Sequence, residues 1–388
     1  MSAVGTRPET GSATPFDRYD GRDGAVLQHG DSWVTAPAGS SLVPVPAGTD
    51  QVGRAAGLAL TTLAGLGGRG VAVGALPYDG SCDAVLRIPQ PASEPGAGSW
   101  RRDEAWRVTE LRPDPLPVVY EAAVERALDA IEAGEIEKVV LARRLVVETD
   151  APIDAGIVAR RLSIAEPGSV VYLIALPDGA TTLVGASPEL LLGREGRSVA
   201  SDPLAGTARR SGDPGRDREV ARQLLATVKE QREHRLASAA VADALSPFCA
   251  DLHVDAEPSL QATATLWHLR TAIRGTLKPD PPDALTIAAA LHPNPAICGT
   301  PKGAAASLIE RLEGFERRYF AGMVGWVDAH GDGEWSLTLR CAEITGSTAI
   351  LTAGAGIVAG SDPAAEDLET EAKFGPVLRA LGVDPAES

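Results

Sequence analysis

Near the carboxyl end of the chain, a predicted loop of small residues leads into three charged side chains at helical spacing. Residues 353–358 read Ala-Gly-Ala-Gly-Ile-Val, and Asp362, followed by a proline, forms a typical helix start. Glu366, Glu369 and Lys373 sit at i, i+3 and i+7, so a helix projects all three from one face. Paired carboxylates suit a hard divalent cation, and backbone N–H groups beside a helix N-terminus suit an anion. The segment therefore predicts a site for a metal-bound carboxylate or phosphate, with a solvated helix face as the alternative.

A second carboxylate pair lies in a densely charged segment, residues 217–244, whose composition and periodicity predict a long helix. Glu230 and Glu233 repeat the i, i+3 spacing. Two such pairs on separate helices could hold Mg²⁺ while leaving coordination positions for water and a substrate oxygen. The neighbouring Lys229 and Arg232 leave a surface ion-pair network as the alternative.

One lysine and one glutamate stand beside apolar strands, where their protonation states would be unusual. The chain has 36 basic residues but only five lysines, so Lys138, which begins the predicted strand 138–147, suggests a property that arginine lacks. Apolar surroundings favour a neutral amine that can act as a base; a side chain reaching out from a strand edge is the alternative. Glu189 follows the apolar strand 181–185, where a desolvated carboxyl stays protonated and can act as a general acid.

Arg340 lies in a segment of alternating polar and apolar residues. Residues 334–342 are predicted to pair with residues 322–328 across a His-Gly-Asp-Gly turn, which puts Arg340 on the polar face. Its guanidinium could bind a carboxylate there, and a solvated sheet face is the alternative. A predicted turn before it in the chain offers the backbone of Gly206 and the hydroxyl of Thr207.

The remaining patterns predict a mixed α+β fold with large, mainly antiparallel sheets flanked by helices. Strands outnumber helices, and several connections are hairpins. Further helices are expected at 123–133, 284–291, 304–312 and 363–381, and further strands at 70–75, 84–88, 170–176, 190–193 and 348–351.

The composition narrows the choice of partners. A net charge of −16 argues against nucleic acid and anionic membranes, whereas an anionic metabolite responds to local charge. No apolar run approaches the roughly 18 residues of a membrane span, and residues 1–20 lack the apolar stretch of a secretory signal. The four cysteines form no zinc-binding pattern, so we expect reduced thiols and a cytoplasmic location.

The order of these segments resembles that of the chorismate-utilising enzymes, which include isochorismate, salicylate, anthranilate and aminodeoxychorismate synthases. The matching segments are residues 137–143, 185–191, 203–207, 229–234, 292–299, 325–326 and 353–358. They lie within a core of residues 118–382; residues 1–117 match less sharply, although residues 74–79 resemble the isochorismate synthase branch. The resemblance implies a single unit of residues 1–388 with the active site between two sheets.

The resemblance also implies roles for the candidate residues. Mg²⁺ is expected to bind Glu233 and Glu369, with Glu230 and Glu366 as direct or water-mediated ligands, and to hold the ring carboxylate of chorismate. Arg340 and the backbone of Ala355 and Gly356 are expected to hold the pyruvyl carboxylate. The other residues expected to line the substrate are Gly206, Thr207, His268 and Lys373. An acidic protein needs such a metal and a few placed cations to bind a dianion.

The expected reaction adds water at ring C2 while the C4 hydroxyl leaves, with Lys138 as general base and Glu189 as general acid. Ammonia-using members carry glutamine in place of Lys138, so we expect no glutamine amidotransferase partner. Aminodeoxychorismate synthases carry a nucleophilic lysine where this chain has Ala205. Ala296 and Ile297 match isochorismate synthases, whereas members that eliminate pyruvate carry threonine in place of Ala296. The expected product is therefore isochorismate, with salicylate synthase as the alternative.

Two other classes of function remain open at this point. A magnesium-dependent hydrolase of a phosphate or carboxylate ester would use the same carboxylates but give Lys138 no role. A non-catalytic binding protein on this scaffold would have lost a catalytic residue, yet the candidate base, acid and metal ligands are all present. We expect a monomeric enzyme that binds chorismate.

Overall fold

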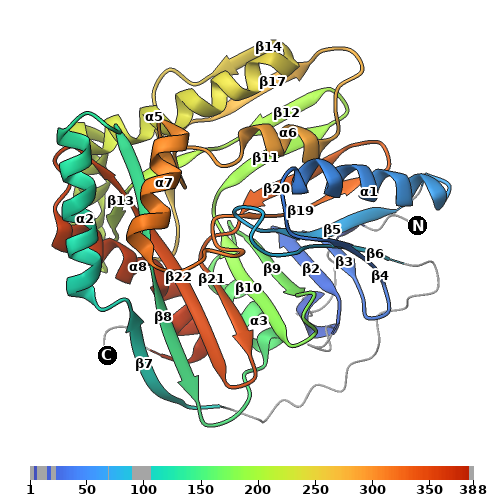
Figure 1. Cartoon of the computed structure of the whole chain (residues 1–388), viewed down its shortest axis with the longest axis horizontal. Helices are drawn as coiled ribbons and strands as arrows, with labels where there is room; N and C mark the ends of the chain where they lie inside the picture. The colour runs from blue at the N-terminus through green and yellow to red at the C-terminus, as the bar shows by residue number, and fades with distance from the viewer. Residues whose placement is uncertain (1–3, 7–14, 19–22, 69, 90–105, 384–388) are drawn as a thin grey trace.

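The computed structural model describes residues 4–6, 15–18, 23–68, 70–89 and 106–383, which form three antiparallel sheets with helices packed around them (Figure 1). This architecture confirms the predicted α+β class with large, mainly antiparallel sheets flanked by helices. Residues before 117 contribute strands to both of the large sheets.

Sheet A has ten strands. In pairing order they are β1 (Val4–Thr6), β3 (Ser32–Ala36), β2 (Ala25–His29), β9 (Val170–Ala175), β10 (Thr181–Ser187), β21 (Cys341–Thr345), β22 (Thr348–Val358), β8 (Lys138–Thr149) and β18 (Gly299–Thr300), with β7 (Val108–Asp114) also paired to β8.

Sheet B has nine strands, and a small sheet C has three. The order in sheet B is β14 (Cys249–Val254), β17 (Ile273–Leu277), β12 (Ser198–Ser201), β11 (Leu190–Glu195), β20 (Gly333–Leu337), β19 (Met323–Asp328), β5 (Val71–Leu76), β6 (Ala84–Ile88) and β4 (Ser41–Val45). Sheet C consists of β13 (Leu204–Arg209), β16 (Leu266–Arg270) and β15 (Ser259–Ala262).

Each group of helices covers a different part of this framework (Figure 1). Helices α3 (Ala155–Ala165) and α8 (Pro363–Leu381) pack on sheet A, and α1 (Gln51–Gly65) and α6 (Ala284–Leu291) pack on sheet B. Helices α2 (Pro117–Glu132) and α7 (Lys302–Glu313) cover β8, and α4 (Pro214–Ala226) and α5 (Val228–Leu245) pack on sheet C. Two 3₁₀ helices occupy Pro15–Arg18 and Ser246–Phe248. Within the described residues, no helix is both long and apolar enough to cross a membrane.

Two neighbouring segments of the chain cross between sheets A and B side by side. Strand β10 of sheet A continues through Glu189 into β11 of sheet B, and β20 of sheet B continues through residues 338–340 into β21 of sheet A. The Ala186 N–H donates a hydrogen bond to the Arg340 carbonyl (3.2 Å), and the Leu337 N–H donates one to the Glu189 carbonyl (3.2 Å). These bonds join the two crossings, so Glu189 and Arg340 lie in the same gap between the sheets.

The predicted continuous strand at 334–342 is wrong. Strand β20 ends at Leu337 and β21 begins at Cys341, because the chain turns between the sheets and Arg340 takes a φ of 49°. A left-handed backbone costs a residue with a side chain about 1–2 kcal/mol and has no place in a regular strand. Arg340 therefore lies between two sheets and not on the polar face of one.

The predicted loop at 353–358 is also wrong, because these residues extend β22. They pair with residues 138–143 of β8 along their whole length. Strand β21 pairs only with residues 348–352, so the opposite edge of β22 is open beyond that point. Small residues fit a strand here because neighbouring backbone and side chains approach Gly354 and Gly356 closely. The open edge of β22 faces the candidate site.

The long helix predicted at 217–244 is two helices that meet at Thr227, whose backbone is extended (φ −75°, ψ 119°). The Gln223 carbonyl accepts both the N–H (2.9 Å) and the hydroxyl (2.7 Å) of Thr227, which together close the last turn of the first helix. The C-terminal helix agrees with the prediction: the Asp362 carboxylate accepts the Ala365 N–H (2.9 Å), and a proline occupies the first turn.

A buried ion pair completes sheet A where β8 has no neighbouring strand. Between β18 and β7, the Val140 carbonyl accepts a hydrogen bond from Arg317 (2.7 Å), and the Ala142 N–H donates to Glu313 (2.7 Å). The Arg317 Nε donates to Glu313 Oε2 (2.9 Å), and both side chains are only 2% exposed. Arg317 also binds the Ile297 carbonyl (2.6 Å), so the pair ties the strand to the loop that carries Ile297.

We predict that Arg317→Met lowers the free energy of unfolding by about 3–5 kcal/mol, because it leaves the Glu313 carboxylate buried without its partner. Urea denaturation followed by circular dichroism measures this loss. The matched control is Arg112→Met, since Arg112 is more than half exposed and its pair with Glu110 spans 4.0 Å. That variant should lose less than about 1 kcal/mol. Equal losses in the two variants would contradict the assignment.

Candidate active site

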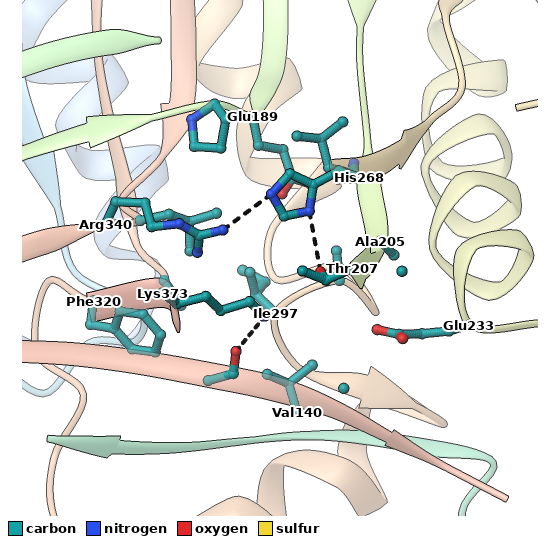
Figure 2. Close-up of a pocket in the computed structure, with 18 residues that line it drawn as sticks. Val140, Glu189, Ala205, Thr207, Glu233, His268, Ile297, Phe320, Arg340 and Lys373 are labelled. Atoms are coloured by element: carbon teal, nitrogen blue, oxygen red, sulfur yellow. Dashed lines mark hydrogen bonds between the residues drawn. The ribbon is translucent and has the colours of Figure 1, made fainter. Parts of the chain in front are cut away.

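A pocket opens where the two crossing segments meet sheet C and the open edge of β22 (Figure 2). The loop at residues 296–297 and the segment at residues 320–321 complete its walls. Ten of the residues singled out in the sequence line it: Glu189, Gly206, Thr207, Glu233, His268, Ala296, Ile297, Arg340, Gly356 and Lys373. The other five lie outside this lining: Lys138, Glu230, Ala355, Glu366 and Glu369.

Glu189 presents a buried carboxyl to the pocket and is 4% exposed. Burial raises the pKa of this carboxyl to about 7. The Leu204 N–H, which donates to Oε1 (3.3 Å), and the positive charges of Lys138 and Arg340 offset only part of that effect. Near neutral pH such a group can release a proton and take one back. Its position and its pKa both fit the predicted general acid.

His268 connects two other candidate residues in a defined tautomer. Arg340 Nη2 lies 3.2 Å from Nε2 of His268, and the Thr207 hydroxyl lies 3.2 Å from Nδ1 (Figure 2). Because an arginine can only donate, Nε2 accepts and Nδ1 carries the proton. Burial, together with the charges of Arg340 and Lys373, lowers the pKa of His268 well below its usual value. The imidazole is therefore neutral and orients the guanidinium without competing for an anion.

Lys138 and Glu233 form an ion pair at the pocket wall, in which Glu233 lines the pocket and Lys138 does not. Lys138 Nζ lies 3.0 Å from Glu233 Oε1, and the lysine side chain is fully buried. Burial alone would raise the pKa of Glu233, but Lys138 lowers it below its usual value. Gly356 makes room for the pair, because a Cβ there would lie 2.0 Å from Glu233 Oε1 and 3.1 Å from Lys138 Cε. The amine is therefore not in apolar surroundings, and it can accept a proton from water only in its neutral form.

The open edge of β22 directs alternate backbone groups into the pocket. The Gly354 carbonyl accepts a hydrogen bond from Lys373 Nζ (2.7 Å), and the Val358 N–H donates to the Ser361 hydroxyl (3.2 Å), so both residues point away from β8. Gly356 lies between them and has the same orientation, whereas Ala355 faces β8. Of the two backbone donors predicted to hold a carboxylate, the Gly356 N–H is therefore directed toward the pocket and that of Ala355 toward the neighbouring strand.

The four predicted metal ligands form two pairs on α5 and α8, and three lysines form ion pairs with them. Lys229 Nζ lies 2.7 Å from Glu366 and 3.3 Å from Glu230, and Lys373 Nζ lies 2.6 Å from Glu369. The turn predicted at Gly206 and Thr207 is wrong, because both residues belong to β13, which has a bulge between Ala205 and Thr207 where Gly206 takes a φ of +74°. Glu230 accepts the Thr207 N–H at this bulge (3.1 Å). The predicted carboxylates thus lie close to one another and beside the pocket.

The chemistry of this donor set fits a hard divalent cation. Burial and the charge of Glu369 raise the pKa of Glu366 to about 7, and burial and Glu233 raise the pKa of Glu230. Uncompensated negative charge of this kind is relieved by a cation with oxygen ligands. As the side chains stand, no three acidic, histidine or cysteine side chains in the described part of the chain are close enough to form a complete ion site. In this arrangement the carboxylates are paired with lysines instead.

The loop at 296–297 is fixed from both sides. The Asn294 carboxamide accepts the Ala296 N–H (2.9 Å), and the Ile297 carbonyl accepts Arg317 (2.6 Å). Both Ala296 and Ile297 line the pocket, so a larger side chain in place of Ala296 would enter the space for substrate.

Two charged residues near the site could not be recognised from the sequence. Lys229, whose side chain is 24% exposed, joins α5 to α8 through Glu366 instead of belonging to a surface network alone. Glu166 ends α3, is 4% exposed, and accepts the Ala264 N–H (3.2 Å) from the tip of the β15–β16 hairpin. Its charge acts on Arg340. A glutamate before a proline at a helix end gives no pattern that predicts a distant arginine.

Comparison with known proteins gives a consistent result. A family model described as "Chorismate binding enzyme" matches residues 100–382. Isochorismate synthase DhbC of Bacillus subtilis is 43% identical, with 81% of this chain and 82% of that protein covered. Isochorismate synthase EntC of Escherichia coli K12 is 40% identical, with 81% of each chain covered.

Solved structures agree with these matches. The crystal structure of a putative 2,3-dihydroxybenzoate-specific isochorismate synthase, DhbC from Bacillus anthracis, superimposes with a TM-score of 0.86 at 36% identity, covering 95% of this chain and 99% of that one. The menaquinone-specific isochorismate synthase MenF of Escherichia coli, at 23% identity and a TM-score of 0.78, shares the fold; the match covers 97% of this chain and 93% of that one. The family model and the relatives each cover most of this chain, which therefore belongs to the family of chorismate-binding enzymes.

Proposed function

We propose that the protein converts chorismate to isochorismate. The observation that carries this proposal is the pocket itself, in which the protonatable carboxyl of Glu189 shares one space with the cations Arg340 and Lys373. Relatives that are 40–43% identical over four fifths of the chain bear the name isochorismate synthase. A non-catalytic binding protein would not need a buried acid with a pKa near neutrality beside an anion-binding arginine, and an ester hydrolase would leave Lys138 without a catalytic role.

Two residues of this chain move protons in the proposed reaction. Lys138 Nζ, as the neutral amine, takes a proton from a water molecule whose oxygen bonds to ring C2. The ring double bonds shift, the bond from C4 to its hydroxyl breaks, and Glu189 protonates that hydroxyl so that it leaves as water. The substrate therefore gains one water and loses one, and its mass is unchanged.

Other residues bind and orient the dianionic substrate. Arg340, oriented by His268, and the N–H of Gly356 are proposed to hold the pyruvyl carboxylate. Lys373, which now binds Glu369 and the Gly354 carbonyl, lies beside the region proposed for the ring carboxylate. A Mg²⁺ ion bound by Glu230, Glu233, Glu366 and Glu369 would hold the ring carboxylate and polarise the ring as a Lewis acid.

The small side chain of Ala296 favours a reaction that stops at isochorismate. Lys138, which stands where ammonia-using members carry glutamine, favours water as the nucleophile. We further propose that residues 1–388 act as one unit, because strands before residue 117 belong to both large sheets. A monomeric state, a cytoplasmic location and independence from a glutamine amidotransferase complete the proposal.

The direct test is incubation of the purified protein with chorismate and Mg²⁺, with products separated by chromatography and identified by mass. We expect a product of unchanged mass and new retention, without pyruvate. EDTA should abolish turnover and added Mg²⁺ should restore it, because the carboxylates would lose the ion that offsets their charge. Salicylate with pyruvate would contradict the product assignment, and no reaction in any sample would contradict the proposed activity.

The base assignment predicts that Lys138→Gln lowers kcat by about 10²–10⁴-fold, because a carboxamide cannot take the proton of water. Chorismate binding, measured by calorimetry, should persist, since Lys138 does not line the pocket. Lys278→Gln is the control, because this exposed lysine donates to the Pro247 carbonyl in the 3₁₀ helix Ser246–Phe248 and does not line the pocket. Retained isochorismate formation by Lys138→Gln would refute the assignment.

The acid assignment predicts a pH dependence. Glu189 must be protonated to act as the acid, so kcat/KM should fall as pH rises through about 7. Glu189→Gln should lose most activity and remove this limb from what remains. A profile that rises steadily through pH 7 would show that Glu189 acts in its ionised form.

A further inference from the structure

Arg340 binds its proposed anion from a backbone conformation that does not suit it. Its φ of 49° lies in the left-handed region, which residues other than glycine rarely adopt. A backbone of this kind persists only where the surroundings impose it, and it is often found at functional sites. Something in the fold must therefore hold the two peptide groups on either side of the Arg340 Cα.

The peptide group before Arg340 is held by Tyr172 of β9. The hydroxyl of this tyrosine donates a hydrogen bond to the Leu339 carbonyl (2.8 Å) from a side chain that is fully buried. The peptide group after Arg340 is held by β10, because the Ala186 N–H donates to the Arg340 carbonyl (3.2 Å). Each peptide plane next to the Arg340 Cα thus has one fixed hydrogen bond, and together the two planes set φ and ψ.

Gly185 allows the tyrosine to reach this position. Gly185 pairs with Tyr172 across β9 and β10. A Cβ at Gly185 would lie 2.4 Å from the Tyr172 hydroxyl and 2.8 Å from the Arg340 carbonyl. Strand β10 therefore needs a glycine at position 185, because the Tyr172 side chain occupies the space of a Cβ there in order to reach the turn that carries Arg340.

We propose that Tyr172 is a positioning residue for the reaction: its hydroxyl fixes the turn at Leu339 and so directs the Arg340 guanidinium into the pocket. The alternative is that the hydroxyl only satisfies a buried carbonyl, in which case its removal affects stability and leaves substrate binding alone. The proposal rests on the proposed function, because it assumes that Arg340 binds a carboxylate of chorismate.

The test is Tyr172→Phe, assayed for isochorismate formation. We expect the KM for chorismate to rise about three- to tenfold, the effect of losing one buried hydrogen bond, while kcat changes less than twofold. The matched control is Tyr120→Phe, because the Tyr120 hydroxyl also donates to a buried carbonyl, that of Leu141 (3.1 Å), but is not bonded to the turn at Arg340. The control should leave KM unchanged at a comparable loss in melting temperature.

An Arg340→Ala background separates positioning from a general loosening of the site. If Tyr172 acts through Arg340, Tyr172→Phe should have less than a twofold effect on kcat/KM in that background. Should Arg340→Ala lack measurable turnover, the same comparison is made on the rise in melting temperature that chorismate causes. An unchanged KM in Tyr172→Phe, or an equal effect with and without Arg340, would overturn the inference. Failure of the wild-type protein to convert chorismate would instead contradict the proposed function.

Discussion

The site depends on one backbone constraint, namely that the chain crosses between sheets A and B twice, from β10 to β11 and from β20 to β21, and that the two crossings lie side by side. The hydrogen bonds between Ala186 and Arg340 and between Leu337 and Glu189 keep these crossings together. A regular strand would place successive side chains on opposite faces of a sheet. The crossing instead puts an acid and a cation in the gap between sheets, where burial is deep enough to raise the pKa of Glu189. Sheet C and the edge of β22 then need only close the space around them.

Charge balance is the second organising principle, because an acidic protein has to bind an acidic molecule. Three of the five lysines pair with the four glutamates of α5 and α8, and they do so within or beside the site. Each pair offsets the charge of a carboxylate from within the protein. In the proposed function a substrate carboxylate and a cation would take the place of these partners, whereas removal of a single member would leave a buried charge unmatched.

The sequence predicted which residues come together better than it predicted the backbone that positions them. Helix α8 and its cap followed from Asp362 and the proline after it, since capping depends only on local residues. The turn at Arg340 could not be predicted, because residues 334–342 alternate as a strand does and the bonds that bend the chain come from Tyr172 and Ala186 far away in sequence. The small residues at 353–358 predict a loop instead of a strand, because the close approach of Glu233 and Lys138 that requires Gly356 comes from distant parts of the chain and no local pattern reveals it.

The buried pair of Glu313 and Arg317 has a consequence for the behaviour of the protein in a crowded solution. Between β18 and β7, the edge of β8 offers the Val140 carbonyl and the Ala142 N–H, and an uncovered edge of this kind is a template on which a foreign strand can add. The two side chains occupy the hydrogen-bonding positions that an added strand would use. Sheet A can therefore keep a gap in its ladder, next to the loop that lines the pocket, without the risk of edge-to-edge aggregation that such a gap would otherwise bring.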